Sequence, residues 1–207
     1  MKNSQISPQA KIAYDQGCRY LKADGVPFSY EKAIPYLKEA ADLGHMKAQY
    51  NLGICLHEGT GITQSYEEAY RYFALAAEAG HPRAYYMLGC YCACGFAFDP
   101  SEENAVHYFR LAADAGIVDA QYDLSVLFLL GETVKSEKDA IHYLQLAADQ
   151  GHADAQYNLG ICYYKGIGVP ISQKDAISYL ELAVKQKQPK AAEALERVMM
   201  TAYRPKN

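Results

Sequence analysis

Apolar positions along the chain follow a helical period. In the segment SYEEAYRYFALAAEAG, residues 65–80, small or apolar side chains stand four, seven, eight, eleven and twelve positions after the opening serine. This spacing places them along one face of a helix of about four turns. The segment AQYNLGICLHEG, which begins at Ala48, has helical spacing too. The pattern therefore predicts two amphipathic helices joined by a loop.

Both segments recur along the chain. We name the second type helix A and the serine-led type helix B. Helix B begins at Ser29, Ser65, Ser101, Ser136 and Ser172, so the steps are 36, 36, 35 and 36 residues. The octapeptide AQYNLGIC of helix A occurs in full at 48–55 and again at 155–162. Such a period predicts helix-turn-helix units that stack and cover one another's apolar faces, as in an α-solenoid.

The repeat pattern sets the expected domain organisation. We predict an N-terminal tail at 1–10 and a C-terminal capping helix at 190–203, followed by a tail at 204–207. Between them, within 11–190, we predict five repeats, at about 11–46, 47–82, 83–118, 119–153 and 154–189.

Local signals support these helices. Each serine occupies the position of a helix N-cap, and Ser65 with Glu68 should form a complete capping box. Glycine inside helix A, as at Gly53 and Gly160, costs about 1 kcal/mol and predicts a helix packed against the gap. Pro35 lies inside the first helix B, where it removes a hydrogen bond and should bend the helix.

Two tyrosines recur in every repeat. The helix B series follows the apolar stripe, so we expect it in the core: Tyr36, Tyr72, Tyr108, Tyr143 and Tyr179. The helix A series should lean on the next helix A and expose its hydroxyl groups: Tyr14, Tyr50, Tyr86, Tyr122 and Tyr157.

The combination of these motifs resembles the Sel1-like repeat, a relative of the tetratricopeptide repeat. The shared pattern is A-x-Y-N-L-G, then G-x-G-V, then A-x-x-Y-x-x-A-A-x-x-G, and residues 155–169 match nearly every position. The resemblance implies a bacterial, all-α protein folded as a right-handed α-solenoid (superhelix) of helix-turn-helix repeats. It also implies a non-enzymatic adaptor or scaffold that holds a protein or peptide partner in a concave groove lined by the A helices.

By analogy with tetratricopeptide repeats, the groove should be lined by the residue before the helix A alanine and by those three, seven and ten positions further on. We therefore expect these residues to bind the partner: Lys47, Tyr50, Ile54, His57, Arg83, Tyr86, Cys90, Asp119, Tyr122, Val126, Leu129, Tyr157, Ile161 and Tyr164. The first of these positions changes from basic to acidic along the chain, which would orient a partner.

We expect the groove to be centred on repeats 3 and 4. Residues 126–130 of repeat 4 are apolar throughout, although a helix with one buried stripe should show polar residues on its other side. Either Val126, Leu129 or Leu130 is exposed and marks an interaction site, or all three are buried against repeats 3 and 5.

Composition further limits the partners and the cellular location that we expect. A net charge of −4 and the absence of a long Lys/Arg run argue against nucleic acid as a partner. Since no apolar run is long enough for a membrane span and none follows the first lysine, we expect neither a membrane segment nor a signal peptide. The six cysteines are then expected to be reduced thiols in the cytoplasm, and a monomer is favoured.

No catalytic, metal-binding or cofactor-binding residue is expected. Cys90, Cys92 and Cys94 lack further ligands nearby, and Cys92 takes the core position that Phe128 holds in the next repeat. The histidines that follow the turn glycines, at His45, His81 and His152, recur with the repeat and should be turn residues.

Two alternatives to the adaptor remain open. One is a dedicated inhibitor or immunity protein for a bacterial toxin or enzyme. The other is a β-lactam-binding or hydrolysing enzyme, as in cysteine-rich relatives. Those relatives carry regularly spaced cysteine pairs and a signal peptide, and neither is recognisable here.

Overall fold

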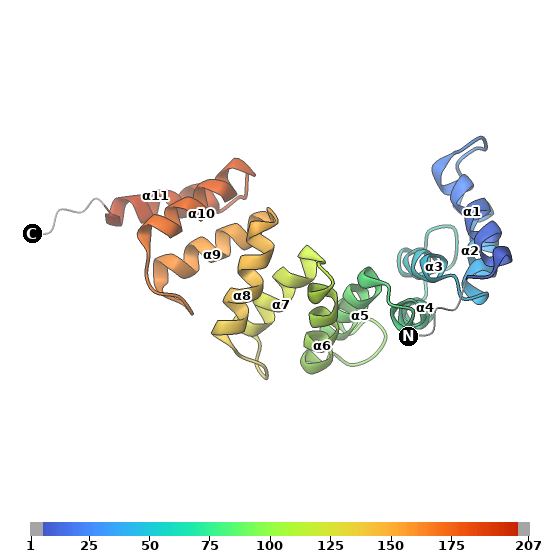
Figure 1. The fold of residues 1–207 in the computed structure, drawn as a ribbon, viewed down its shortest axis with the longest axis horizontal. Coiled ribbons are helices and arrows are strands. Elements are labelled where there is room, and N and C mark those ends of the chain that lie inside the picture. Colours follow the sequence, from blue (N-terminus) through green and yellow to red (C-terminus); the bar gives the residue numbers. More distant parts are fainter. Residues whose placement is uncertain (1–5, 203–207) are drawn as a thin grey trace, which may run out of the picture. The chain divides into compact units, whose positions relative to one another are not determined.

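The computed structural model describes residues 6–202, where it contains eleven α-helices and no strand (Figure 1). The A helices are α1 (Pro8–Lys22), α3 (Met46–Glu58), α5 (Pro82–Cys94), α7 (Val118–Leu130) and α9 (Ala153–Lys165). The B helices are α2 (Tyr30–Asp42), α4 (Tyr66–Glu78), α6 (Glu102–Asp114), α8 (Glu137–Asp149) and α10 (Gln173–Lys185). The last helix is α11 (Ala191–Ala202). The predicted all-α repeat fold is confirmed.

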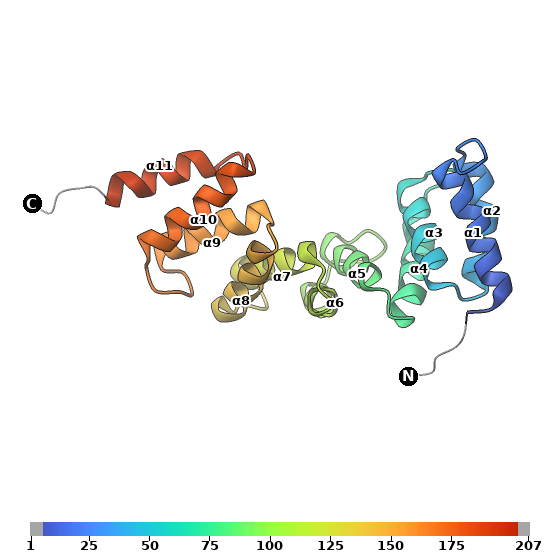
Figure 2. The same ribbon diagram turned by 45° about the horizontal axis from the view of Figure 1, so that its top comes forward.

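The chain divides into two compact units, residues 1–108 and 109–207, and the boundary lies inside α6. In the first unit, each helix from α1 to α5 packs against the next. In the second unit the same is true from α7 to α11, and α11 also contacts α9 (Figures 1 and 2). Each unit is therefore a stack of helix pairs.

The five serines cap the B helices as predicted. Their hydroxyl oxygens accept the N–H of the residue three positions on, at 3.2–3.3 Å, from Lys32, Glu68, Asn104, Asp139 and Asp175. Their own N–H groups donate to the last turns of the preceding A helices, to the carbonyls of Tyr20, Leu56, Cys92, Phe128 and Tyr163. Each serine is thus held by its side-chain hydroxyl and by its backbone N–H, which fixes the loop before helix B.

The predicted capping box at Ser65 is wrong. The Ser65 N–H, which Glu68 would have to accept, already donates to the Leu56 carbonyl at 3.0 Å. The Ser65 hydroxyl donates instead to the Glu67 carboxylate at 3.4 Å. The tertiary bond to helix A has taken the place of the local one.

The glycines inside helix A allow helix B of the same repeat to approach closely. A Cβ atom on Gly53 would lie 2.6 Å from the Phe73 ring, and one on Gly160 would lie 2.8 Å from Leu180. Phe73 and Leu180 are fully buried. The predicted close packing is confirmed at these two positions.

Of the helix B tyrosines, Tyr143 is buried as predicted, but the other four are not core residues, contrary to expectation. Tyr36 is 37% exposed, and Tyr72, Tyr108 and Tyr179 are partly buried; Tyr143 alone in the series reaches 9%. The core position is the next residue along, in Leu37, Phe73, Phe109, Leu144 and Leu180. The tyrosine hydroxyls reach polar groups on neighbouring B helices: Tyr72 donates to Asp42 and Tyr143 to Asp114.

One boundary is corrected. The N-terminal tail does not extend to residue 10, because α1 begins at Pro8 with Ser7 as its N-cap, a Ser-Pro signal visible in the sequence. Pro35 does not end its helix: α2 runs through it over 13 residues, as many as each of the other B helices. The predicted tail at 204–207 lies outside the described residues. Within residues 6–202, no helix combines the length and apolar character that crossing a bilayer requires.

Candidate functional site

The helix A tyrosine of one repeat stacks on the histidine that begins helix A of the next. The ring centroids are 4.2 Å apart for Tyr14 and His45, and 4.4 Å for Tyr50 and His81. The corresponding distance for Tyr122 and His152 is 4.5 Å, and in all three pairs the ring planes lie within 20° of parallel. These tyrosines therefore help to join successive repeats.

The same histidines are helix N-caps, which confirms that they are turn residues. Nδ1 of His45 accepts the Ala48 N–H at 3.2 Å, and Nδ1 of His152 accepts the Ala155 N–H at 3.2 Å. Only a ring with an unprotonated Nδ1 can accept these bonds. Burial lowers the pKa of His45 and of His81, which favours that neutral form.

The tyrosine hydroxyls at these junctions are also engaged. Tyr14 accepts a hydrogen bond from Asn51, and Tyr122 accepts one from Asn158, each at 3.4 Å. Burial raises the pKa of Tyr14 to about 12 and raises the pKa of Tyr50 and Tyr122 as well. These phenols stay protonated at neutral pH.

Two clefts in the first unit adjoin α1 and α3. The first has a volume of about 310 Å³, and Tyr50 and Ile54 line it together with Leu21, Tyr30, Asn51, Cys55 and Glu58. The second, of about 380 Å³, is lined by Ile6, Lys11, Tyr14, Asp15, His45, Met46 and Lys47. Three of the expected partner-binding residues, Lys47, Tyr50 and Ile54, therefore lie at clefts.

His57 lies in an aromatic cluster rather than at either cleft. Its Nδ1 is 2.9 Å from the hydroxyl oxygen of Tyr91, a fully buried residue. Its ring centroid is also 5.4 Å from those of Tyr66 and Phe96. Much of the ring is therefore already in contact within the unit.

A third cleft, of about 300 Å³, lies between α9 and α11 in the second unit. Tyr157, Ile161 and Tyr164 line it from α9, as expected of the groove face. The sequence pattern did not identify its other lining residues as a group: Lys165, Lys190, Glu193, Ala194, Arg197 and Val198. The one signal available was the helical spacing of Lys190, Ala194 and Arg197 in the predicted capping helix.

The expected centre of the groove, repeats 3 and 4, has its A helices in different units. On α5, Arg83 is exposed while Tyr86 and Cys90 are half-buried. On α7, Asp119 is exposed, and its carboxylate lies 3.9 Å from His152 Nε2. Tyr122 is half-buried under its stack with His152.

The apolar run of α7 divides between core and surface. Leu129 packs against the core cluster that contains Leu144 and Leu159, and Val126 is half-buried. Leu130 is 76% exposed. Of the three residues, Leu130 is therefore the accessible apolar side chain.

The cysteines follow the repeat pattern. Cys92 is buried, 2% exposed, at the repeat position of the equally buried Phe128, whereas Cys94 is exposed. Burial raises the pKa of the Cys55 and Cys162 thiols to about 11. Among the described residues, no three His, Cys, Asp or Glu side chains come together in a way that could hold a metal ion.

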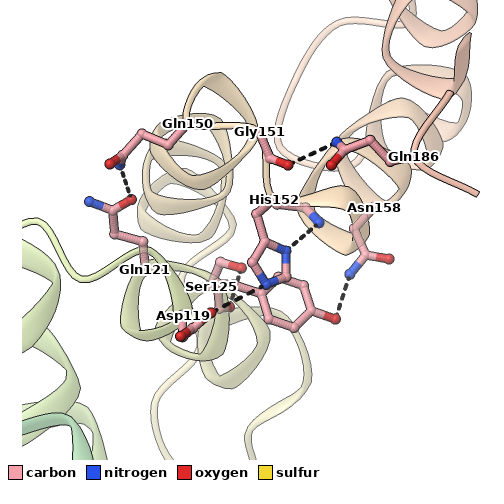
Figure 3. Close-up of polar contacts among 10 residues, drawn as sticks. Asp119, Gln121, Ser125, Gln150, Gly151, His152, Asn158 and Gln186 are labelled. Carbon is pink, nitrogen blue, oxygen red and sulfur yellow. Dashed lines mark hydrogen bonds and ion pairs between the residues drawn. The ribbon is translucent and has the colours of Figure 1, made fainter. Parts of the chain in front are cut away.

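A glutamine that follows the helix A alanine was not recognised from the sequence. Gln49, Gln121 and Gln156 are buried, and their amide groups donate to the carbonyls of Ala41, Ala113 and Ala148 at 3.1–3.2 Å. In the second unit their carbonyl oxygens accept from Gln150 and Gln186, each at 2.7 Å, as Figure 3 shows for Gln121 and Gln150. The paired residues lie 29 and 30 positions apart, and each pair joins an A helix to the C-cap of the B helix that follows it.

Comparison with known proteins supports this architecture. A family model described as the Sel1 repeat matches residues 9–45, 47–81, 82–117, 118–152 and 153–187. The search of curated proteins found no significant match.

Several solved structures are similar. A Sel1 repeat protein from Oxalobacter formigenes is 28% identical with a TM-score of 0.83, and the match covers 98% of this chain and 83% of that one. A protective antigen of uropathogenic Escherichia coli strains, which displays an SLR fold, is 27% identical with a TM-score of 0.89 over 93% of this chain. This chain spans only 42% of the antigen's length. An immunity protein from Pseudomonas aeruginosa, 20% identical with a TM-score of 0.53, is similar over 96% of this chain and 81% of its own, which shows the fold alone.

Proposed function

The chain belongs to the Sel1 repeat family, whose members generally mediate protein–protein interaction, and on this premise we propose that it is a non-enzymatic adaptor or scaffold. Its partner is a protein or peptide that binds along the exposed surfaces of the A helices. The partner-binding residues are those of the groove face, among which Tyr50, Ile54, Tyr157 and Ile161 are central.

One observation carries this proposal. Tyr50 and Ile54 line a cleft in the first unit, and Tyr157 and Ile161, at the same two repeat positions, line a cleft in the second. In both places an apolar floor is accompanied by charged side chains, Glu58 in one cleft and Lys165 in the other. An apolar centre with a polar rim is the usual composition of a protein interface.

The ionisation state of the nearby groups supports binding rather than nucleophilic chemistry. Cys55 borders the cleft of the first unit, and burial keeps its thiol protonated at neutral pH because its pKa is raised to about 11. A thiol is a nucleophile only as the thiolate. The Tyr50 hydroxyl also stays protonated, because burial raises its pKa.

The test compares two double variants in affinity capture from a native lysate. Ile54→Ser with Ile161→Ser removes apolar surface from both clefts. Leu75→Ser with Leu182→Ser is the matched control, because these leucines are 42% and 40% exposed on B helices. We expect the first pair to lose at least tenfold of the captured partner and the control pair to retain it, with both keeping the helical circular dichroism of the wild type.

Equal losses in the two variants, or none in either, would contradict a helix A binding surface. The number of captured partners and their stoichiometry also distinguish an adaptor from a dedicated inhibitor or immunity protein. Several partners of moderate affinity are expected of an adaptor, whereas a single partner at one-to-one stoichiometry would indicate a dedicated inhibitor or immunity protein. Turnover of a chromogenic β-lactam by the purified chain, absent after heat inactivation, would overturn the non-enzymatic assignment.

A further inference from the structure

The cleft between α9 and α11 has an apolar floor. Tyr157, Ile161 and Tyr164 stand on one side at helical spacing, and Ala194 and Val198 stand on the other. Val198 is 1% exposed and Ala194 8%, so both are fixed by packing against the core of the second unit. The floor is therefore a preformed apolar surface.

The rim of this cleft is cationic. Lys165, Lys190 and Arg197 line it with Glu193 as the single carboxylate, which leaves a local charge of +2, three cations less one anion. The chain as a whole carries −4. The cleft thus has the opposite sign to the protein around it and attracts anionic groups.

The single carboxylate does not neutralise the site. Glu193 bonds Arg197 at 2.9 Å, one turn apart on α11, with 78% and 67% of the two side chains exposed. An exposed pair of this kind contributes little to stability, and it engages only Arg197, so Lys165 and Lys190 stay available to an incoming carboxylate. Lys165 and Lys190 are exposed and form no ion pair with any other described residue.

We propose that this cleft binds a partner segment in which an acidic residue adjoins a large apolar residue. The apolar side chain packs on Tyr157, Ile161 and Tyr164, and the carboxylate lies between the Lys165 and Lys190 ammonium groups. This inference rests on the proposed function, because the cleft is formed in part by the helix A face of repeat 5. It adds the chemistry of the partner and the place where its acidic end docks.

Flexible lysine stems suit this role. Each can follow a carboxylate on an extended segment while its aliphatic part covers the apolar floor. Charge attraction also speeds encounter and orients the segment, with its acidic end toward Lys165 and Lys190. Binding should therefore weaken as ionic strength rises.

The experiment selects peptides from a random dodecapeptide phage library on the purified full chain. Enriched peptides are synthesised with a fluorescein label and titrated by anisotropy. We expect enrichment of Asp or Glu next to Leu, Ile or Phe, with binding at least tenfold weaker to the Lys165→Glu/Lys190→Glu variant. Ile161→Ser should weaken the same peptides several-fold.

Lys138→Glu/Lys174→Glu is the matched control. It makes the same change in net charge at exposed positions in the first turns of α8 and α10, outside the cleft, and should leave binding within about twofold of wild type. Thermal melts of all variants establish that they are folded.

Three results would overturn the inference: enriched peptides without acidic residues, acidic peptides whose binding survives the charge reversal, or no enriched peptide at all. If selected peptides instead require Tyr50 and Ile54, the proposed function stands and only this site is wrong. Capture of a partner from lysate tests the function independently of the library.

Discussion

Two junctions between repeats use the same positions but differ in their polar contacts. At the junction of repeats 4 and 5, Tyr122 stacks on His152 and accepts from Asn158, and His152 Nδ1 accepts the Ala155 N–H. Figure 3 shows His152 and Asn158 at this junction. Two residues before His152, Gln150 donates to the carbonyl oxygen of Gln121 in the same repeat. The polar atoms of this interface are paired.

At the junction of repeats 2 and 3, Tyr50 stacks on His81 in the same way. The corresponding hydrogen bonds to the tyrosine from an asparagine, to the histidine Nδ1 and to the glutamine carbonyl oxygen are missing among the described residues. Met87 stands where repeat 5 has Asn158, and Ala79 where repeat 4 has Gln150. The Ala84 N–H donates to the His81 carbonyl. As a result, His81 Nδ1 and Gln49 Oε1 are buried without a hydrogen-bond partner among the described residues.

The comparison shows that the ring stack persists without these hydrogen bonds. Centroid distances of 4.4 and 4.5 Å are nearly the same at the two junctions. Apolar contacts replace part of what is lost, since Met87 and Tyr50 both pack against the core cluster of the first unit. Packing therefore sets the geometry of a junction, and the polar pairs add to its stability.

The largest expected difference between the two junctions is the loss of unfolding free energy when the histidine of each is replaced by alanine. His152→Ala removes both a helix cap and a stacked ring, so it should cost about 2 kcal/mol of unfolding free energy. His81→Ala removes only the stack and also eliminates an orphaned nitrogen, so it should cost about 1 kcal/mol or less. Urea denaturation measures both, and hydrogen exchange of α9 and α5 localises the effect.

Equal costs for the two substitutions would show that the cap contributes nothing. His45→Ala is a useful internal check, since His45 has the same stack and cap as His152 and should behave like it.

Removing Gln150 should give Gln121 the same unpaired carbonyl oxygen that Gln49 has. Gln150→Ala leaves the buried Gln121 carbonyl oxygen without its donor, which should destabilise the second unit by about 1 kcal/mol. Faster hydrogen exchange confined to α7 and α8 is expected. Unchanged exchange in these helices would show that solvent replaces the donor at no cost.

The reverse substitution should repair the weaker junction. Ala79 is exposed, and Ala79→Gln places a carboxamide donor where Gln49 Oε1 lacks one, so we expect a gain of about 0.5–1 kcal/mol. Ala115→Gln is the matched control, because the corresponding helix A position holds Tyr85 rather than glutamine. A gain in the control of the same size would mean that the effect is helix propensity alone.

The smallest expected effect is a pH dependence. Burial lowers the pKa of His45 and His81 in the folded state, and at His81 the nearby Arg83 and Lys47 lower it further. Their stabilising contribution is therefore present above the ordinary histidine pKa of about 6.5 and is lost as pH falls below it toward the folded-state value. Melting temperature should fall from pH 7 to pH 5.

The His45→Ala/His81→Ala variant should show a shallower fall over the same range. Because carboxylates also titrate on approaching pH 5, the informative quantity is the difference between the two slopes. Parallel slopes would show that these rings do not titrate on unfolding in this range.

Much of the fold was predictable because the signals are local. Serine caps, the helical period and the glycine gap in helix A each depend on residues within one or two turns or on one hairpin. Four of the five helix B tyrosines were wrongly predicted to be core, and the core side chain is that of the next residue. A wide apolar stripe does not tell which of two adjacent residues faces the core. The capping box at Ser65 failed because a backbone carbonyl of helix A competed for the same N–H.

The candidate site was predicted only in part. Family resemblance identified Tyr157, Ile161 and Tyr164, which the structure places at one cleft. Lys190 holds the groove position before a helix A alanine, but Lys165 and Arg197 were not grouped with it, because they lie on different helices, α9 and α11. The pattern left open which of Val126, Leu129 and Leu130 would be exposed; Leu129 packs against the core, and the exposed side chain is Leu130.

By itself, the sequence of this protein determined the number of repeats, the helices and their caps, since these follow from spacing and local hydrogen bonds. Only the tertiary structure decided which polar groups meet: His152 stacks on Tyr122, Gln150 donates to Gln121, and the buried Gln49 carbonyl oxygen has no hydrogen-bond partner among the described residues. The physical reason is distance along the chain. These partners lie about 30 residues apart, and no local pattern brings them together before the helices stack.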